Sequence, residues 1–286
     1  MLQRLDASPF EMRRIALTLR MHILKMIAGK GKGHTGPALS IADIMTALYF
    51  GVLNVDPEDP HNPGRDRFIL SKGHACTALY AALAERGYFP GEKLDEYYEL
   101  DSYLGGHPVK GLPGVEAATG SLGHGLPISV GLALAAKFDG HKHRVFTLLG
   151  DGEVQEGSVW EAAMAAAHFR LDNLVAVVDR NNLGVDGYTE ELMALEPLED
   201  KWRSFRWEVR TVDGHDPAEL VQVLRSAPFA SGKPSIVLAL TTKGKGIDFV
   251  ENRVEWHHKA PDPQQAEEAF RQLRAQMDAL EREIES

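Results

Sequence analysis

Short apolar runs alternate with amphipathic segments along most of the chain. Apolar runs without strict alternation predict strands that are buried on both faces. Such strands are typical of a parallel sheet with helices on both faces, so the pattern predicts an α/β fold. The predicted strands are Phe68–Leu70, Val145–Leu149, Leu174–Val178, Trp207–Val212 and Ile236–Leu240, and the predicted helices between them are Thr77–Glu85, Ile128–Phe138, Val159–Phe169 and Ala218–Ser226.

Two further helices are predicted near the N-terminus. Ser8, Pro9 and Glu11 form a capping signature, and apolar residues follow them at steps of three and four. Ser40, with Asp43 three residues later, predicts the cap of a second helix that runs through Phe50. The first of these helices has one apolar face, which we expect to be buried.

The last part of the chain predicts an amphipathic helix. From Asp262 on, apolar residues recur at alternating steps of four and three, with charged residues between them. This spacing suits a helix that packs on a partner and equally one that packs on its own domain, so both interpretations stay open. We therefore divide the chain into one domain, residues 1–262, and a C-terminal helix, residues 263–286.

Composition limits the kinds of protein that the chain can be. The chain has 286 residues, with 31 Lys and Arg against 41 Asp and Glu, and a net charge of −10. This charge argues against a protein whose main partner is nucleic acid. No apolar run approaches the roughly 20 residues that cross a membrane. Because Cys76 is the one cysteine and the first residues lack the apolar segment of a signal peptide, we expect a cytoplasmic protein.

Polar residues follow two neighbouring predicted strands. Gly150, Asp151 and Gly152 come directly after one strand, and Asn181 and Asn182 follow the next. Because the carboxyl ends of parallel strands meet at one edge of a sheet, we expect the carboxylate and the amide to lie close together. These oxygens suit Mg²⁺, which often leaves positions to phosphate and water. Since neither G-x-x-x-x-G-K-[ST] nor G-x-G-x-x-G occurs here, the pattern predicts a magnesium-bridged diphosphate bound without either motif.

These residues also carry a resemblance to a known family. Gly150-Asp151-Gly152, followed after 28 residues by Asn181-Asn182, resembles the thiamine diphosphate motif. Residues from about 10 to 262 are similar to the N-terminal half of transketolase, which implies its diphosphate-binding α/β domain. The other segments that carry the resemblance are Gly33–Gly36, Leu70–Ala75, Gly106-His107, Leu112–Gly123 and Trp256–Pro261.

The resemblance implies a role for each matching residue. Magnesium would be bound by the side chains of Asp151 and Asn181 and by the carbonyl of Leu183. Histidines would surround the sugar and move protons near neutral pH, a task that suits imidazole. These catalytic residues would be His34, His74, His107 and His257. Thiamine diphosphate would be contacted by His74, Gly120, Ser121, Leu122, Gly150, Asp151, Gly152, Glu153, Asn181 and His257.

The resemblance further implies a second chain. In the family, the glutamate that activates the cofactor and the arginines that bind the sugar phosphate belong to the next domain. Only 25 residues follow Pro261, too few for such a domain. We therefore expect the N-terminal subunit of a split transketolase of the pentose phosphate pathway, in a heterotetramer with a separate C-terminal subunit. Together they would transfer a two-carbon ketol unit from a ketose phosphate to an aldose phosphate.

Several alternatives stay open. The chain could belong to a related thiamine diphosphate enzyme that acts on another sugar phosphate, or it could hold the cofactor without taking part in catalysis. A 2-oxo acid dehydrogenase is disfavoured, because decarboxylation does not require the four histidines. The sequence also leaves open which of His257 and His258 faces the site, and what Lys243 and Lys245 do.

Overall fold

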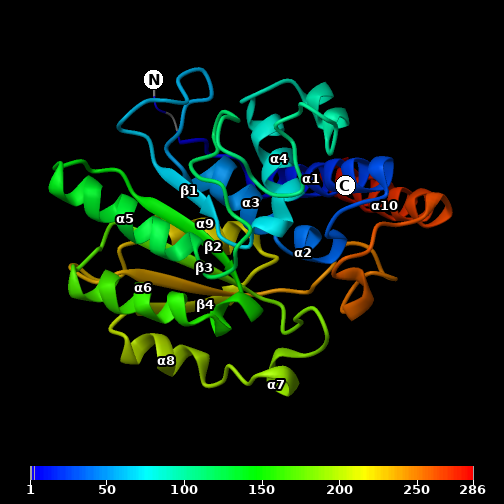
Figure 1. Cartoon of the computed structure of the whole chain (residues 1–286). Helices are drawn as coiled ribbons and strands as arrows, with labels where there is room; N and C mark the ends of the chain where they lie inside the picture. Colours follow the sequence, from blue (N-terminus) through cyan, green and yellow to red (C-terminus); the bar gives the residue numbers. More distant parts are fainter. Residues whose placement is uncertain (1, 3, 286) are drawn as a thin grey trace.

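Five parallel strands form the centre of the molecule (Figure 1). The computed structural model describes residues 2 and 4–285, with side chains as far as Glu283; Met1, Gln3 and Ser286 lie outside the described residues. Every predicted strand is present, with its ends shifted by no more than two residues. The strands are β1 (Arg67–Leu70), β2 (Val145–Gly150), β3 (Leu174–Arg180), β4 (Glu208–Asp213) and β5 (Ser235–Leu240), in the order β1-β2-β3-β5-β4.

Helices precede, connect and follow the strands. The four helices predicted between strands are present, each within three residues of its predicted ends: α4 (Cys76–Arg86), α5 (Gly125–Phe138), α6 (Gly157–His168) and α9 (Pro217–Arg225). The remaining helices are α1 (Pro9–Lys30), α2 (Thr35–Ser40), α3 (Ala42–Ala47), α7 (Thr189–Leu192), α8 (Leu198–Ser204) and α10 (Pro263–Glu285).

Side chains of the strands divide between two hydrophobic clusters, one on each face of the sheet. On β2, Phe146 and Leu148 pack with α1, α3, α4 and α9, whereas Val145 and Leu149 pack with α5, α6 and α8. Alternation along a strand places successive side chains on opposite faces, so an apolar run without alternation is buried on both. The predicted fold, a parallel sheet with helices on both faces, is confirmed.

One of the two predicted N-terminal caps is present and the other is wrong. The Ser8 hydroxyl accepts a hydrogen bond from the Glu11 amide, and the Glu11 carboxylate accepts one from the Ser8 amide. Ser40 instead ends α2, and its hydroxyl donates to the buried carboxylate of Asp179 at 2.6 Å. The prediction fails because that buried carboxylate needs donors, and it takes the hydroxyl that a cap would use. Helix α3 begins at Ala42 and continues into a π-helical turn, Leu48–Val52.

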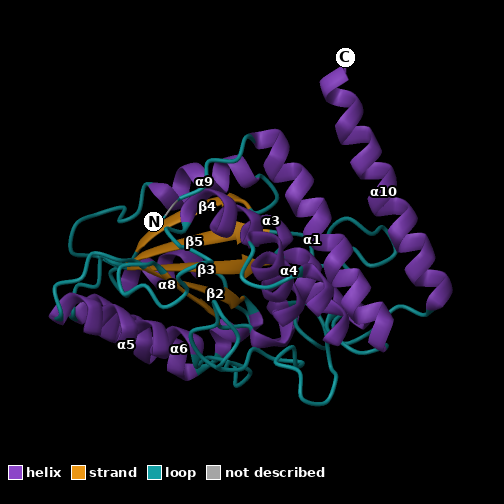
Figure 2. Ribbon diagram, turned by 90° about the horizontal axis from the view of Figure 1, so that it is seen from above, coloured by secondary structure: helices purple, strands orange, loops and turns teal. Residues whose placement is uncertain are grey.

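The C-terminal helix α10 folds back onto the body of the protein. It lies alongside α1 (Figure 2), and Ala269, Leu273 and Leu280 are buried in the same cluster as α1. An ion pair of 2.5 Å joins Arg13 to Glu283. Within the described residues α10 therefore packs on its own chain, while the division into residues 1–262 and 263–286 stays a prediction.

The described chain contains no helix that is both long and apolar enough to cross a membrane. The cytoplasmic location stays a prediction. Loops gather at the carboxyl edge of the sheet, where β2, β3 and β5 end side by side: Gly150 is in register with Asp179, and Arg180 with Leu240. This arrangement places Asp151, Asn181 and the segment after Thr241 at one edge, where ligands of parallel sheets bind.

Candidate functional site

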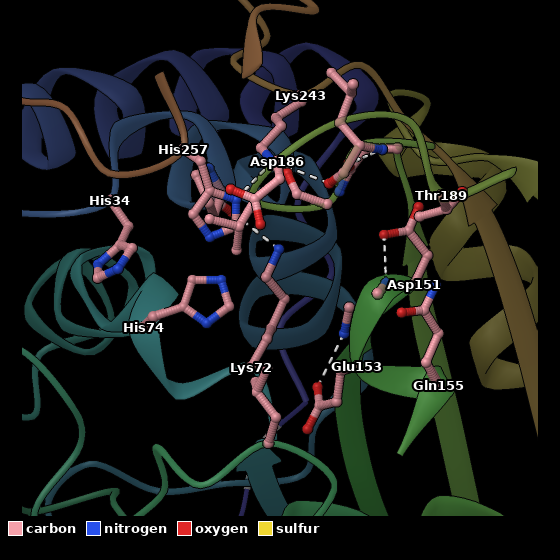
Figure 3. Close-up of a pocket in the computed structure, with 18 of the residues that line it drawn as sticks. His34, Lys72, His74, Asp151, Glu153, Gln155, Asp186, Thr189, Lys243 and His257 are labelled. Atoms are coloured by element: carbon pink, nitrogen blue, oxygen red, sulfur yellow. Dashed lines mark hydrogen bonds between the residues drawn. The ribbon is translucent and has the colours of Figure 1, made fainter. Parts of the chain in front are cut away.

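A cavity of about 460 Å³ lies at the carboxyl edge of the sheet. Figure 3 shows histidines gathered on one side of it and Asp151 on the other, with two lysines between them. Of the predicted site residues, the cavity is lined by His34, His74, Gly120, Leu122, Gly150, Asp151, Gly152, Glu153, Asn181, Leu183 and His257. Ser121 is exposed and does not line the cavity, and His107 lies outside the lining as well.

The three predicted metal ligands lie at one end of the cavity. The Asp151 carboxylate accepts hydrogen bonds from the amides of Gly152 at 2.8 Å and Asn182 at 2.6 Å. The Asn181 side-chain oxygen accepts one from the Leu183 amide at 3.0 Å. Arg180 lies 3.4 Å from Asp151. The three predicted ligands are one carboxylate, one side-chain amide oxygen and one backbone carbonyl. Among the described residues there is no group of three or more His, Cys, Asp and Glu side chains that could hold a metal.

The charged form of the Asp151 carboxylate is unfavourable in its buried position. Burial, together with the nearby carboxylate of Asp179, raises the pKa of Asp151 to about 6. A cation would stabilise such a carboxylate, and a carboxylate, an amide oxygen and a carbonyl are the hard oxygen ligands that Mg²⁺ prefers. The residues present therefore fit the predicted metal.

A buried ion pair supports this end of the cavity. Lys72 donates to Asp179 at 2.5 Å, and the two side chains are almost fully enclosed. Asp179 also accepts from Asn181 Nδ2 at 3.0 Å and from the Thr241 hydroxyl. Burial alone would raise the pKa of Asp179, but Lys72 and the hydrogen bonds hold it below its ordinary value. Asp179 therefore fixes the amide so that its oxygen, not its nitrogen, is available at the metal end. Lys72 lies in the segment Leu70–Ala75 that carries the resemblance, but neither Lys72 nor Asp179 is among the predicted site residues.

Glu153 connects two loops at the cavity wall. Its buried carboxylate accepts hydrogen bonds from the amides of Gly150 and Gly123, at 3.0 and 2.9 Å, and from the Ser71 hydroxyl. Burial raises the pKa of Glu153 despite these donors. Since both oxygens are used within the protein, the geometry gives Glu153 a role in shaping the loop around Gly120 and Leu122. Its predicted contact with a cofactor stays untested.

Histidine rings form a cluster at the other end of the cavity. The His34 ring centre lies 5.0 Å from that of His74 and 5.8 Å from that of His257, and the latter two rings stack at 5.3 Å. The His107 ring lies at the rim, 6.3 Å from His34. His257 lines the cavity, whereas the exposed His258 packs edge-on against His34 at 4.5 Å. The structure thus places four predicted histidines together and adds His258 at the rim.

The histidines in the cavity are uncharged near neutral pH. Burial and neighbouring His258 lower the pKa of His34 to about 4, and burial and Lys243 lower that of His257 to about 3. Burial and Lys72 bring the pKa of His74 well below its ordinary value. Neutral imidazoles both donate and accept hydrogen bonds, which is what contacts with sugar hydroxyls require.

Lys243, whose role the sequence leaves open, points into the cavity between its two ends. Its ammonium donates to the carbonyls of Leu183 and Gly184, at 2.9 and 2.7 Å, and to Nδ1 of His257 at 2.7 Å. Within the described residues no carboxylate pairs with it, so its positive charge faces the cavity. Burial and the charge of Lys72 lower the pKa of Lys243 to about 8. Lys245, by contrast, is partly exposed and lies 3.7 Å from Glu251.

A buried charged network holds the loop that carries Lys243. His215 donates from Nδ1 to Asp43 at 2.7 Å and accepts the Thr242 amide at Nε2, also at 2.7 Å. Arg20 binds Asp43 with both terminal nitrogens and donates from Nε to the Lys245 carbonyl at 3.0 Å. The loop is therefore fixed on both sides of Lys243. Sequence reasoning missed this network, because its members come from α1, α3 and the turn before α9.

Comparison with known proteins identifies the family. Residues 12–278 match the family described as "Transketolase, thiamine diphosphate binding domain". The chain belongs to this family. It is 48% identical over 266 residues to an apulose-4-phosphate transketolase subunit from Actinobacillus succinogenes, covering 92% of this chain and 96% of the relative. It is 45% identical over 249 residues to a 6-deoxy-6-sulfo-D-fructose transketolase subunit from a Clostridium species, covering 87% and 90%.

Solved transketolases share the fold. The crystal structure of transketolase from Campylobacter jejuni superposes with a TM-score of 0.86 at 31% identity and covers 94% of this chain. The chain spans 43% of that transketolase chain. These comparisons confirm the predicted family and the predicted α/β fold. They also confirm that the chain is a transketolase-type enzyme subunit with a thiamine diphosphate-binding domain.

Proposed function

We propose that this transketolase subunit binds thiamine diphosphate through Mg²⁺ and, with a second subunit, transfers a two-carbon ketol unit from a ketose phosphate to an aldose phosphate. One observation carries the proposal: a single cavity joins the Asp151–Asn181–Leu183 oxygens at one end to the histidine cluster at the other. A magnesium-bound diphosphate would need the oxygen ligands, and a sugar bound next to it would need the histidines.

The cavity residues suit a magnesium-bound diphosphate. Asp151, Asn181 and the Leu183 carbonyl would hold the metal, and the Lys243 ammonium would offset the negative charge of the phosphates. Gly120, Gly150 and Gly152 line the cavity without side chains that would fill it. When bound, thiamine diphosphate supplies the carbanion chemistry of ketol transfer, and the protein supplies orientation and electrostatics.

The histidines would act on the sugar. His34, His74 and His257 are neutral and enclosed, so His34 and His74 each offer one hydrogen-bond donor and one acceptor to hydroxyl groups. His257 accepts from Lys243 at Nδ1, which leaves its Nε2–H as the donor. His107, at the rim, would contact the part of the sugar that lies nearest to solvent. Making and breaking a carbon–carbon bond beside a hydroxyl requires a proton acceptor within reach, and imidazole is suited to that near neutral pH.

The proposed partner is a separate C-terminal subunit. The two relatives above are named as subunits, and this chain covers nearly their whole length. Exposed apolar side chains lie at and beside the cavity, on the segment after β3: Val185, Tyr188, Leu192 and Met193. Apolar patches of this kind mark interaction surfaces. We propose an assembly with two copies of each chain, in which the partner supplies the groups that activate the cofactor and bind the sugar phosphate.

The names of the relatives bear on which ketose is the donor substrate. The two relatives are named for different substrates, apulose 4-phosphate and 6-deoxy-6-sulfo-D-fructose. Both names carry an anionic group at one end of a sugar, so we propose a ketose with a terminal phosphate or a similar anion. A place in the pentose phosphate pathway stays a prediction. A panel of phosphorylated and sulfonated ketoses, offered to the assembled pair, identifies the donor.

Reconstitution tests the proposed function. The purified chain is mixed with its C-terminal subunit, thiamine diphosphate and Mg²⁺, and ketol transfer is measured. We expect activity only with all components, and a chelator should abolish it until Mg²⁺ is restored. His107→Ala should lower the rate on the order of 100-fold or more. Full activity of the chain alone would refute the two-subunit proposal, and an unchanged rate in the His107 variant would indicate a subunit that only holds the cofactor.

A further inference from the structure

The loop that carries His107 depends on contacts from outside its own sequence. His107 lies in a long segment between the 3₁₀ turn Gly91–Glu96 and α5 that contains no helix or strand. Its ring is placed at the rim, 6.3 Å from His34, and a Cβ built on Gly120 would lie 3.0 Å from that ring. Loops are more mobile than the elements that they connect. Contacts with packed side chains therefore decide how firmly the His107 ring is held.

Tyr80, on α4, reaches this loop from inside the protein. The side chain is fully buried, and its hydroxyl lies 2.9 Å from the His107 carbonyl and 3.1 Å from the Gly105 carbonyl. Burial raises the pKa of Tyr80 well above its ordinary value, so the hydroxyl keeps its proton and is a donor. Cys76, one helical turn earlier, places its sulfur 3.5 Å from the same Gly105 carbonyl. One face of α4 therefore binds the backbone on both sides of Gly106.

A second tyrosine, Tyr98, also contacts this loop. A Cβ built on Gly106 would lie 2.0 Å from the Tyr98 hydroxyl, so the backbone passes directly against that side chain. The Tyr98 amide also binds the Leu104 carbonyl at 2.8 Å. The loop therefore contacts both Tyr98 and α4, and its two carbonyls meet the Tyr80 hydroxyl.

We propose that Tyr80 is a positioning residue for His107, holding the Gly105–His107 backbone so that the imidazole stays at the rim of the cavity beside His34. This inference rests on the proposed function, because it requires that His107 contacts the sugar. Tyr80 itself does not line the cavity. Its hydroxyl, which binds the Gly105 and His107 carbonyls, therefore acts on the reaction through the loop.

The isosteric variant Tyr80→Phe tests this inference in the assembled enzyme. Loss of one hydrogen bond that holds the loop should lower kcat/KM for the ketose about 2- to 10-fold, while the dissociation constant of thiamine diphosphate changes less than 2-fold. The matched control is Tyr49→Phe, a buried tyrosine of the same hydrophobic cluster that packs on Phe68. We expect that control to retain the wild-type kcat/KM.

A double-mutant cycle separates positioning from a general loss of structure. Tyr80→Phe combined with His107→Ala should be no slower than His107→Ala alone, because the hydroxyl acts only through that imidazole. The inference would be overturned if the losses in kcat/KM of the two single variants multiplied in the double variant. A loss of the same size in Tyr49→Phe would overturn it as well. Hydrogen exchange gives a measurement independent of activity: deuterium uptake at residues 104–108 should rise in Tyr80→Phe and nowhere else. Unchanged uptake overturns the inference, whereas wild-type activity of His107→Ala refutes the proposed role of His107.

Discussion

The ammonium of Lys243 lies 2.9 Å from the carbonyl oxygen of Leu183 and 2.7 Å from Nδ1 of His257. One side chain thus connects the two ends of the cavity, the oxygen-rich end and the histidine end. Because the carbonyl is also a proposed metal ligand, the lysine lies beside the position that a diphosphate would take. Its role, open at the level of sequence, is therefore best tested through cofactor binding.

Lys243→Met should weaken the binding of thiamine diphosphate about 10- to 100-fold in the presence of Mg²⁺. The variant keeps the aliphatic part but removes the positive charge. In the wild type, one of the three donors that now bind Leu183, Gly184 and His257 would turn to the phosphates, a charged contact worth roughly 1.5–3 kcal/mol. Titration calorimetry of the assembled pair measures the change. Lys245→Met, at a partly exposed position of the same loop that does not line the cavity, is the matched control and should bind normally. Equal affinities of the Lys243 variant and the wild type would contradict the proposed contact.

His215→Ala should also weaken cofactor binding, by about 2- to 10-fold, although the residue does not line the cavity. The change removes the acceptor for the Thr242 amide and releases one side of the loop that carries Lys243. His215→Asn keeps both a donor and an acceptor in the side chain and should therefore recover part of the lost cofactor affinity. The affinity of the double variant with Lys243→Met should equal that of Lys243→Met alone; a further decrease would show that His215 acts by another route.

Asp179→Asn should lower the free energy of unfolding by roughly 3–5 kcal/mol. The substitution leaves the ammonium of Lys72 buried without its counter-charge, which costs more than the pair itself contributes. Urea unfolding of the purified chain measures this change. Asp200→Asn, at an exposed position of α8, provides the control and should change stability little. A loss of less than about 1 kcal/mol would mean that Lys72 sheds its charge or finds another acceptor.

The stability of the protein should decrease as the pH falls from 7 to 5. His34 has a pKa of about 4 in the folded chain, against roughly 6.5 when unfolded. Above pH 6.5 both states are neutral and the contribution is complete; below it the unfolded chain gains a proton that the folded chain does not, until the pH reaches the folded pKa. The charged and titratable groups that face His34 are His74, His107, His257, His258, Lys72 and Lys243.

Urea unfolding at pH 7 and at pH 5 measures this dependence. His34→Asn should lose less stability between the two values than the wild type, because one proton fewer is taken up on unfolding. His61→Asn, at an exposed position in the loop before β1, should keep the wild-type dependence. An identical pH dependence of the His34 variant and the wild type would contradict the lowered pKa.

The parts of the structure that depend on local periodicity were predictable. Every predicted strand lies within two residues of the observed one. Strands β2, β3 and β5 are buried on both faces and therefore appear in the sequence as continuous apolar runs, whereas the edge strand β4 has one exposed face and was still found from its short apolar run. The neighbourhood of Asp151 and Asn181 followed from the same argument, since residues after adjacent parallel strands meet at one edge. No contact between distant segments had to be known for either prediction.

The features that depend on contacts between distant segments were not predictable from the sequence. Ser40 carries the pattern of a helix cap, but its hydroxyl binds Asp179, which is 139 residues away in the chain. Lys243 lies in a glycine-containing loop where a solvated side chain is the usual outcome, and only the closed fold turns it into the cavity. The choice between His257 and His258 depends on the turn Val254–Trp256, whose buried Trp256 sets the direction of the residues after it. Asp179 and Leu183, the partners of Ser40 and Lys243, are distant in sequence, and Trp256 is a neighbour of His257 whose own position depends on packing in the core.

The packing of α10 has a practical consequence for experiments on this chain. Gln276 donates to the Gly246 carbonyl and Gln272 donates to Asp248, so α10 contacts the same loop that Arg20 and His215 hold. A shortened version, or a fusion that displaces this helix, would loosen a segment that reaches the cofactor pocket. An affinity tag belongs at the amino end, and titrations made with a trimmed protein would understate how tightly the intact subunit retains its vitamin.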